Sequence, residues 1–195
     1  INMAIIPLEK RLRKSLHKRV ALAQDSIVDM LYKFFPDAVI HGGTAIWRCY
    51  DGKRFSEDVD AYIPLVHKND NFEGYMKSLK DNGFSVKKFK LTSNSIFSKF
   101  LLFNTEVRFE AVFKNVKGLV VKPFETSDGT FMNVYTLSPE DILIEKISAY
   151  KTRGKVKDLY DIWYLLNLVE NGEKVRKDIV GLDPKVPEDY KTLKA

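Results

Sequence analysis

The sequence has little cysteine and no long apolar segment. Its single cysteine, Cys49, excludes an intramolecular disulfide framework and any cysteine-rich zinc site. No run of about 18 apolar residues is present, so we expect no transmembrane helix. Residues 1–10 contain no apolar core long enough for a signal peptide, and we therefore expect a cytoplasmic protein.

Glycine and proline are also scarce, at 10 and 7 of 195 residues, which excludes a collagen-like or linker-dominated chain. What the sequence does contain is ordinary for a folded protein, since 45% of its residues are hydrophobic and 30% are charged. This composition excludes a wholly disordered chain. The length fits one compact domain, or one domain with a helical appendage.

The formal net charge of +6 is unevenly distributed along the chain. Residues 1–20 carry six Lys or Arg and one acid, and residues 77–122 carry ten Lys or Arg and three acids. Clusters of this kind suit a polyanionic partner such as nucleic acid, but solvated helix faces and exposed strand lysines also produce them. Charge alone therefore leaves both interpretations open.

The apolar periodicity predicts an α+β fold, with a mixed sheet flanked by helices and a helical bundle at the C-terminal end. Apolar residues recur every three or four positions over residues 8–34, which indicates an amphipathic helix with at most one break. Ser138 and Pro139 are typical of a helix start. The expected strands are 38–41, 58–63, 84–90, 95–103, 106–113, 119–121 and 131–137, and the other expected helices are 44–50, 71–81, 139–151, 157–169 and 174–180.

These elements predict four segments along the chain. In the helical segment, the aromatic side chains of Tyr160, Trp163 and Tyr164 are expected to lie in the bundle core rather than to form a base-stacking surface. The segments are a basic amphipathic helix at 1–36, an α/β core at 37–136, a helical subdomain at 137–181 and a loosely held tail at 182–195.

Two short motifs carry the chemistry. Gly42 and Gly43 follow an apolar strand and precede a helix, so the backbone can approach a ligand closely and the helix start can offer N–H groups to a phosphate. Asp58 and Asp60 are two residues apart on the next strand and share one face. Neighbouring carboxylates repel each other unless a cation lies between them, and oxygen ligands suit Mg²⁺ or Mn²⁺.

A third acid is expected from a later strand. Glu106, Arg108 and Glu110 share one face of the segment 106–113, whose other face is apolar. We prefer Glu110 to Glu106, because Glu110 is flanked by large apolar residues and Glu106 lies nearer the end of the strand.

Four separated blocks then occur in the order of a known family. They are Gly42-Gly43-Thr44-Ala45, Arg54-x-Ser56-Glu57-Asp58-x-Asp60, Lys146 with Ala149, and Lys157-Asp158-Leu159-Tyr160-Asp161-Ile162-Trp163. This pattern resembles the AbiEii/AbiGii-type nucleotidyltransferases of the DNA polymerase β superfamily, which include toxins of toxin–antitoxin and phage-defence systems. The spacing from Gly43 to Asp58 is longer than the general superfamily pattern.

The resemblance implies a polymerase β-like fold and a two-metal transfer of a nucleoside monophosphate from an NTP to an acceptor hydroxyl. It assigns the metal ions to Asp58, Asp60 and Glu110, with Glu110 also binding or activating the attacking hydroxyl. It assigns phosphate binding to the turn, and the residues implied there are Gly42, Gly43 and Thr44, with Ser56 nearby.

The resemblance extends to the helical subdomain. It implies that Lys146 and Asp158 are catalytic, with Lys146 also serving as a point charge for phosphate, and that Asp161 binds the nucleotide. Other interpretations stay open, because Lys146 is also compatible with a surface position, Asp161 with a cap or a lysine pair, and Ser56 with a structural role.

The partners implied are an NTP, an RNA such as tRNA or a protein as acceptor, and a cognate antitoxin protein, with no membrane. Two alternatives remain open: a small-molecule nucleotidyltransferase, and a non-catalytic module that binds RNA or protein on the same fold. Because the excess charge lies mainly in residues 1–20, we expect that helix to hold an anionic acceptor rather than to serve the chemistry.

Overall fold

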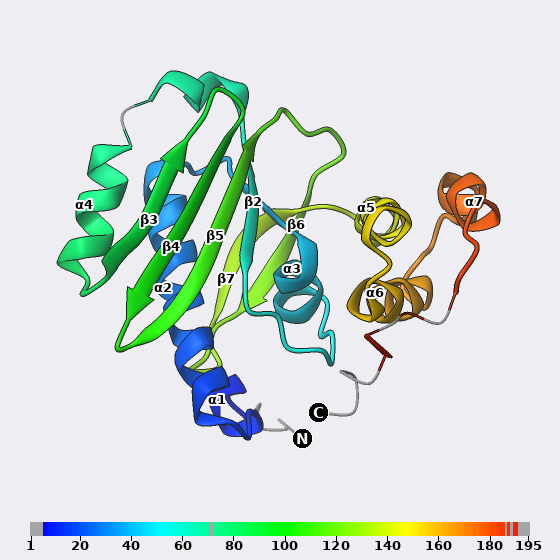
Figure 1. Ribbon diagram of the computed structural model, residues 1–195, viewed down its shortest axis with the longest axis horizontal. Helices are drawn as coiled ribbons and strands as arrows, with labels where there is room; N and C mark the ends of the chain where they lie inside the picture. Colours follow the sequence, from blue (N-terminus) through cyan, green and yellow to red (C-terminus); the bar gives the residue numbers. More distant parts are fainter. Residues whose placement is uncertain (1–5, 71, 186, 188, 191–195) are drawn as a thin grey trace. The chain divides into compact units, whose positions relative to one another are not determined.

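The computed structural model describes residues 6–70, 72–185, 187 and 189–190 (Figure 1). Its contacts divide the chain into two compact units, Ile1–Thr136 and Leu137–Ala195, which we call unit 1 and unit 2. Unit 1 contains a mixed sheet flanked by helices and unit 2 contains helices, so the predicted α+β fold is confirmed. Within the described residues, no helix combines the length and apolar character needed to cross a bilayer.

The sheet of unit 1 has seven strands in the described part of the chain, in the order β3-β4-β5-β2-β1-β7-β6. The pairs β1–β7 and β2–β5 are parallel and the other neighbouring pairs are antiparallel. The central strands β1 and β2 are short. Strand β1 ends directly before the glycine pair, and β2 begins directly after Asp58 and contains Asp60. The strands are β1 (Val39–His41), β2 (Val59–Ile63), β3 (Ser85–Leu91), β4 (Ser95–Leu102), β5 (Thr105–Phe113), β6 (Val120–Glu125) and β7 (Phe131–Thr136).

Helix α2 passes behind strands β3–β5 in Figure 1, whereas α4 lies at the edge of the sheet beside β3, and both helices bury the same face of the sheet. Tyr75 of α4 is buried there against Phe100 of β4 and Phe109 of β5, with ring centroids 6.5 and 6.0 Å apart. The alternation of β5 is therefore as predicted, with its apolar residues in the core and its charged residues on the opposite face. The helical segments of unit 1 are α1 (Leu8–Arg11), α2 (Ser15–Phe34), α3 (Gly42–Cys49), η1 (Leu65–Asn69) and α4 (Glu73–Asp81).

The amphipathic helix expected over residues 8–34 is broken once, between α1 and α2. Leu8 and Ala21 are buried with Trp47 of α3, so both helices pack on unit 1 rather than forming a separate appendage. Two of the basic residues in this region are already engaged. Arg11 pairs with Glu125, and Arg19 Nε donates a hydrogen bond to Thr105 Oγ1 (3.0 Å).

Unit 2 contains α5 (Pro139–Arg153), α6 (Val156–Leu166) and α7 (Gly172–Val180). Ser138 caps α5, as predicted, because its hydroxyl accepts a hydrogen bond from Asp141 N (3.3 Å). The expectation that Trp163 lies in the bundle core is wrong, since the residue is 61% exposed. It projects from α6 away from the buried side defined by Ile162 and Leu165.

The tail expected at 182–195 lies partly outside the described residues. Within the described part, Tyr150 Oη donates a hydrogen bond to the carbonyl oxygen of Lys185 (2.7 Å). Asp189 Oδ1 accepts one from Val156 N at the start of α6 (2.9 Å). These contacts anchor this portion of the tail to α5 and α6.

Candidate functional site

The glycine turn between β1 and α3 requires glycine at its first position. Gly42 has φ +71°, in the left-handed region that disfavours other residues. A Cβ added there would lie 2.5 Å from Asp60 Oδ2, so the carboxylate of β2 already occupies that space. The turn and the second aspartate of the motif are therefore in direct contact.

Gly43, the next residue of the turn, is just as closely packed. A Cβ at this position would lie 2.7 Å from Ser56 Oγ and 2.9 Å from Arg54 Nη2. Thr44 Oγ1 donates a short hydrogen bond to the carbonyl oxygen of Asp58. The first turn of α3 thus holds the segment that leads into β2, and it brings the two motifs of the sequence together.

A further residue that sequence reasoning missed supports this segment. Gln24 of α2 is completely buried, and its Nε2 donates to the carbonyl oxygens of Ser56 (2.9 Å) and Asp58 (3.3 Å). The available signal was a polar residue on the apolar face of an amphipathic helix, between Ala23 and Ile27. Buried amides of this kind are retained where backbone groups need a partner.

Register places the third acid. Asp60 and Glu110 are direct partners in the parallel pair of β2 and β5. Glu106 lies toward the start of β5, where Lys99 Nζ (2.7 Å) and Lys87 Nζ (3.5 Å) contact its carboxylate. The structure therefore brings Glu110, and not Glu106, to Asp60. Burial separates the two acids only weakly, because Glu110 is the less exposed residue as a whole but its side chain is 44% exposed against 38% for Glu106.

Arg108 lies among these acids. Its Nη2 donates a short hydrogen bond to Asp58 Oδ2, and its Nε is 3.0 Å from Glu110 Oε1. Burial alone would lower the pKa of Arg108, but the hydrogen bond and charge of Asp58, with the charges of Glu110 and Asp60, raise it above its ordinary value. A guanidinium therefore bridges two of the three predicted metal ligands, a feature that sequence reasoning did not foresee.

The donor chemistry of the three acids suits a hard divalent cation, because it consists only of carboxylate oxygens. Among the described residues, however, no group of three or more His, Cys, Asp or Glu side chains is arranged to hold a metal ion. The ion pairs of Arg108 are consistent with this, since the guanidinium supplies the positive charge that such a cation would bring. The carboxylate oxygens are thus of the kind that a divalent cation binds, but in this structure Arg108 is paired with Asp58 and Glu110.

The remaining predicted site residues form a second cluster in unit 2. Lys146 Nζ is 2.7 Å from Asp161 Oδ2 and 3.9 Å from Asp158 Oδ1. Arg153 donates two hydrogen bonds to the carboxylate of Asp158, at 2.6 and 2.7 Å. Lys146, Asp158 and Asp161 are all buried. Here two cations and two anions join α5 to α6, so Lys146 is neither an exposed surface residue nor a solvated point charge.

A model of the family described as nucleotidyl transferase AbiEii toxin, type IV TA system, matches residues 28–183. The chain belongs to this family. The match covers most of both units and confirms the resemblance carried by the four sequence blocks. A comparison with curated proteins gave no match.

Solved structures with the nucleotidyltransferase fold resemble this AbiEii family member. MenT4, a nucleotidyltransferase toxin from Mycobacterium tuberculosis, is 16% identical with a TM-score of 0.60, over 87% of this chain and 65% of MenT4. A candidate nucleotidyltransferase from H. pylori is 21% identical with a TM-score of 0.58, over 83% of this chain and 72% of that one. The antibiotic-resistance factor ANT(2'')-Ia is 13% identical with a TM-score of 0.55, over 91% and 96%. At these identities the likenesses establish the fold, and the chain spans less than two thirds of MenT4.

Proposed function

We propose that this AbiEii family protein is a metal-dependent nucleotidyltransferase that moves a nucleoside monophosphate from an NTP to an acceptor hydroxyl. One observation carries the proposal: the Asp60 carboxylate lies against the glycine turn at Gly42 and is in register with Glu110. An anion-binding helix start and paired carboxylates are thus joined at one place, which is what transfer from a polyphosphate requires.

The turn would hold the polyphosphate of the NTP. Gly42 and Gly43 begin α3, whose first N–H groups have no partner within the helix and so suit phosphate oxygens. The hydroxyl of Ser56 and the guanidinium of Arg54 both lie against Gly43 and could donate to the same phosphate. The hydroxyl of Thr44 donates to the carbonyl oxygen of Asp58, so Thr44 would contact the phosphate through its backbone N–H in the first turn of α3.

The acids would hold the metal ions and orient the acceptor. When bound, Mg²⁺ or Mn²⁺ supplies positive charge to the transferred phosphate and to the leaving pyrophosphate. Asp58 and Asp60 would hold the ions, and Glu110, beside Asp60 on β5, would accept a hydrogen bond or the proton from the acceptor hydroxyl. The pairing of Asp60 with Glu110, and the position of Asp58 directly before β2, support a shared role for the three carboxylates.

We also propose that the protein acts as a toxin of a toxin–antitoxin or phage-defence system, in the cytoplasm, with a cognate antitoxin as its functional partner. The description of the matching family as type IV toxins supports this part of the proposal. RNA, including tRNA, is the acceptor class that the basic segments favour. The interpretation of Lys146, Asp158 and Asp161 as nucleotide ligands stays a prediction, because their observed contacts are with one another and with Arg153.

Transfer of label tests the proposed activity. Wild-type protein is incubated with each of four α-labelled NTPs and Mg²⁺ or Mn²⁺, in the presence of total RNA, of protein alone or of an aminoglycoside. We expect label on RNA with at least one NTP. Label on the aminoglycoside alone would support the small-molecule alternative. No transfer under any condition would contradict the enzymatic proposal and favour a non-catalytic module. The ion pair between Arg108 and Asp58 is also compatible with such a module.

Arg108→Ala is expected to tighten binding of Mn²⁺ or Mg²⁺ roughly tenfold, because the guanidinium no longer competes for Asp58 and Glu110. Calorimetry without nucleotide measures this directly. Lys99→Ala is the matched control, since it also removes one positive charge from the sheet face opposite α2 and α4, where Lys99 contacts Glu106. An equal gain in both variants would show that only net charge matters and would contradict direct competition.

A further inference from the structure

The sheet face opposite α2 and α4 carries an ordered row of side chains that leads away from the acids. Glu110 of β5 is opposite Phe97 of β4, and Phe97 is opposite Lys90 of β3. Because directly paired residues project from the same face, Asp60, Glu110, Phe97 and Lys90 form one row across four strands. At about 4.8 Å per strand, the row is about 14 Å long.

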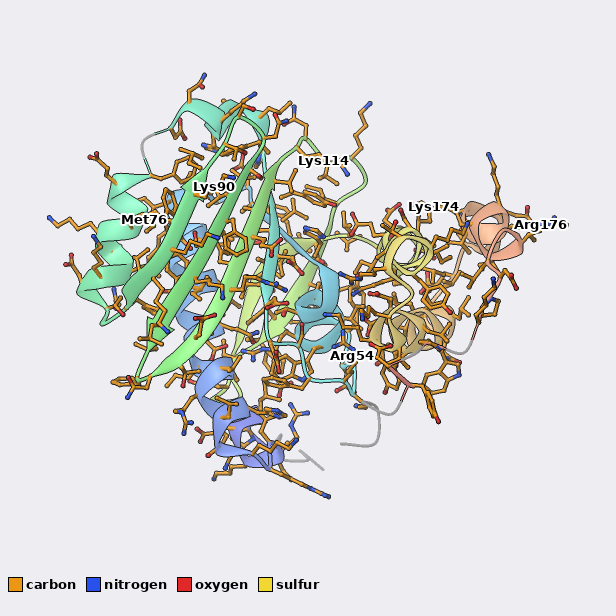
Figure 2. The ribbon with its side chains drawn as sticks, viewed as in Figure 1. Arg54, Met76, Lys90, Lys114, Lys174 and Arg176 are labelled. Atoms are coloured by element: carbon orange, nitrogen blue, oxygen red, sulfur yellow. The ribbon has the colours of Figure 1, made fainter. Side chains whose placement is uncertain are left out.

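The character of this row changes along its length. Its β2 and β5 end is acidic, whereas its β3 and β4 end is basic and aromatic. Lys88 Nζ lies over the ring of Phe97, 5.0 Å from its centroid. Lys88 is also opposite Lys99, so it projects from the same face as Lys90. Figure 2 shows Lys90 among the side chains of these strands.

The lysines on β3 and β4 differ in their ion pairs. Lys87 and Lys99 contact the carboxylate of Glu106, which partly neutralises their positive charge. No carboxylate of the described residues forms an ion pair with Lys88 or Lys90, and both residues are exposed. Lys88 and Lys90 are therefore lysines of this face that no carboxylate in the described part of the chain neutralises, at the end of the row farthest from Asp60, and the contact of Lys88 is with the ring of Phe97.

We propose that this row, which we call the strand track, binds the single-stranded 3′ segment of an RNA acceptor. Phosphates would contact Lys88 and Lys90 and draw Lys88 away from the ring of Phe97. One base would then stack on this half-buried ring, and the terminal hydroxyl would lie toward Glu110 and Asp60. Basic side chains with an interleaved aromatic ring are the combination that single-stranded nucleic acid requires. The inference rests on the proposed function and deepens it by placing the acceptor.

Binding of RNA without catalysis tests the strand track. A fluorescent single-stranded RNA with a free 3′ hydroxyl is titrated with full-length protein in EDTA, and anisotropy is followed over a range of salt concentrations. In Lys88→Ala/Lys90→Ala we expect weaker binding and a salt slope reduced by roughly 1.4, about 0.7 for each phosphate left without its lysine. Phe97→Leu should weaken binding roughly tenfold with little change in slope. An RNA duplex serves as competitor and should bind more weakly, because its paired bases cannot stack on Phe97.

The matched control is Lys77→Ala/Lys80→Ala, which removes the same charge from exposed positions of α4, on the covered side of the sheet. Its salt slope should equal that of wild type. Equally weakened RNA binding in the two double variants would overturn the strand track. Wild-type protein that binds no RNA at low salt would also overturn it, and would leave a protein as the partner for this surface. Gel filtration tests whether Lys88 and Lys90 only protect the edge strand β3 from pairing with other chains. In that case their removal would cause aggregation without a selective loss of RNA binding.

The two proposals fail in different ways. In one outcome, wild-type protein transfers label, and Lys88→Ala/Lys90→Ala binds and labels RNA as well as wild type does. The strand track is then wrong and the nucleotidyltransferase proposal stands. If RNA binding depends on Lys88 and Lys90 but no NTP yields label, the strand track stands and the enzymatic proposal is wrong.

Discussion

Asp60→Asn is expected to lower nucleoside monophosphate transfer by on the order of 10³-fold or more while the protein stays folded. The substitution keeps the shape that fits over Gly42 but removes the negative charge from the point where β2 meets the glycine turn. A metal ion held by the acids would lose a charged ligand, and with it several kcal/mol of stabilisation for the transferred phosphate. Transfer of α-labelled NMP under initial-rate conditions measures the loss.

Glu106→Gln provides the control for this variant. Glu106 is on the same sheet face and loses the same charge, but its contacts are with Lys87 and Lys99 rather than with the turn. We expect activity within a few-fold of wild type. Comparable losses for Glu106→Gln and Asp60→Asn would show that the acids act through the general potential of the face and would contradict a specific metal site at Asp60.

Lys146→Ala is expected to lower the free energy of unfolding by about 3–5 kcal/mol, because it leaves buried carboxylate charge without its closest cation. Asp161 would be affected most, since Arg153 still holds Asp158. Urea denaturation monitored by circular dichroism measures the change. Lys157→Ala, at an exposed position of α6, should change stability by less than about 0.5 kcal/mol.

A paired substitution separates the structural role of Lys146 from a role in binding phosphate. Lys146→Met/Asp161→Leu replaces the buried pair with apolar side chains of similar size, a change that is often neutral for stability. If the folded double variant still binds and uses NTP, the cluster is structural. If it is stable but has lost NTP binding, the family-based assignment of Lys146 to the nucleotide is supported, and a purely structural interpretation is contradicted.

The sequence predicted those parts of the site that depend on local chemistry. Gly42 was expected at the turn because of its position between an apolar strand and a helix, and the structure gives it a positive φ. The two faces of β5 followed from simple alternation. The choice of Glu110 over Glu106, by contrast, was made by burial, whereas the feature that places Glu110 beside Asp60 is the parallel register of β2 with β5. Register between distant strands is not visible in one sequence.

Two residues illustrate what local patterns leave out. Arg108 was visible only as a charged residue between two acids on one strand face, and its bond to Asp58 depends on the neighbouring strand. Gln24 looked like one polar residue on an apolar helix face. It binds the carbonyl oxygens of Ser56 and Asp58 because the segment before β2 lies against α2. Trp163 shows the opposite error, since an aromatic residue among core positions of α6 is 61% exposed. Each case depends on which elements become neighbours.

The hydrogen bonds of Gln24 bear on how far the protein can be truncated from its N-terminal side. The family match begins at residue 28, which invites expression of residues 28–183 as a minimal domain. Such a fragment would lack Gln24, so the carbonyl oxygens of Ser56 and Asp58 would lose their donor from α2. It would also lack Leu8 and Ala21, which bury Trp47 of the helix that begins with the glycine turn. The family match therefore begins after residues that support the segment around the glycine turn, and we expect a fragment that starts at residue 28 to be less stable than one that includes α1 and α2.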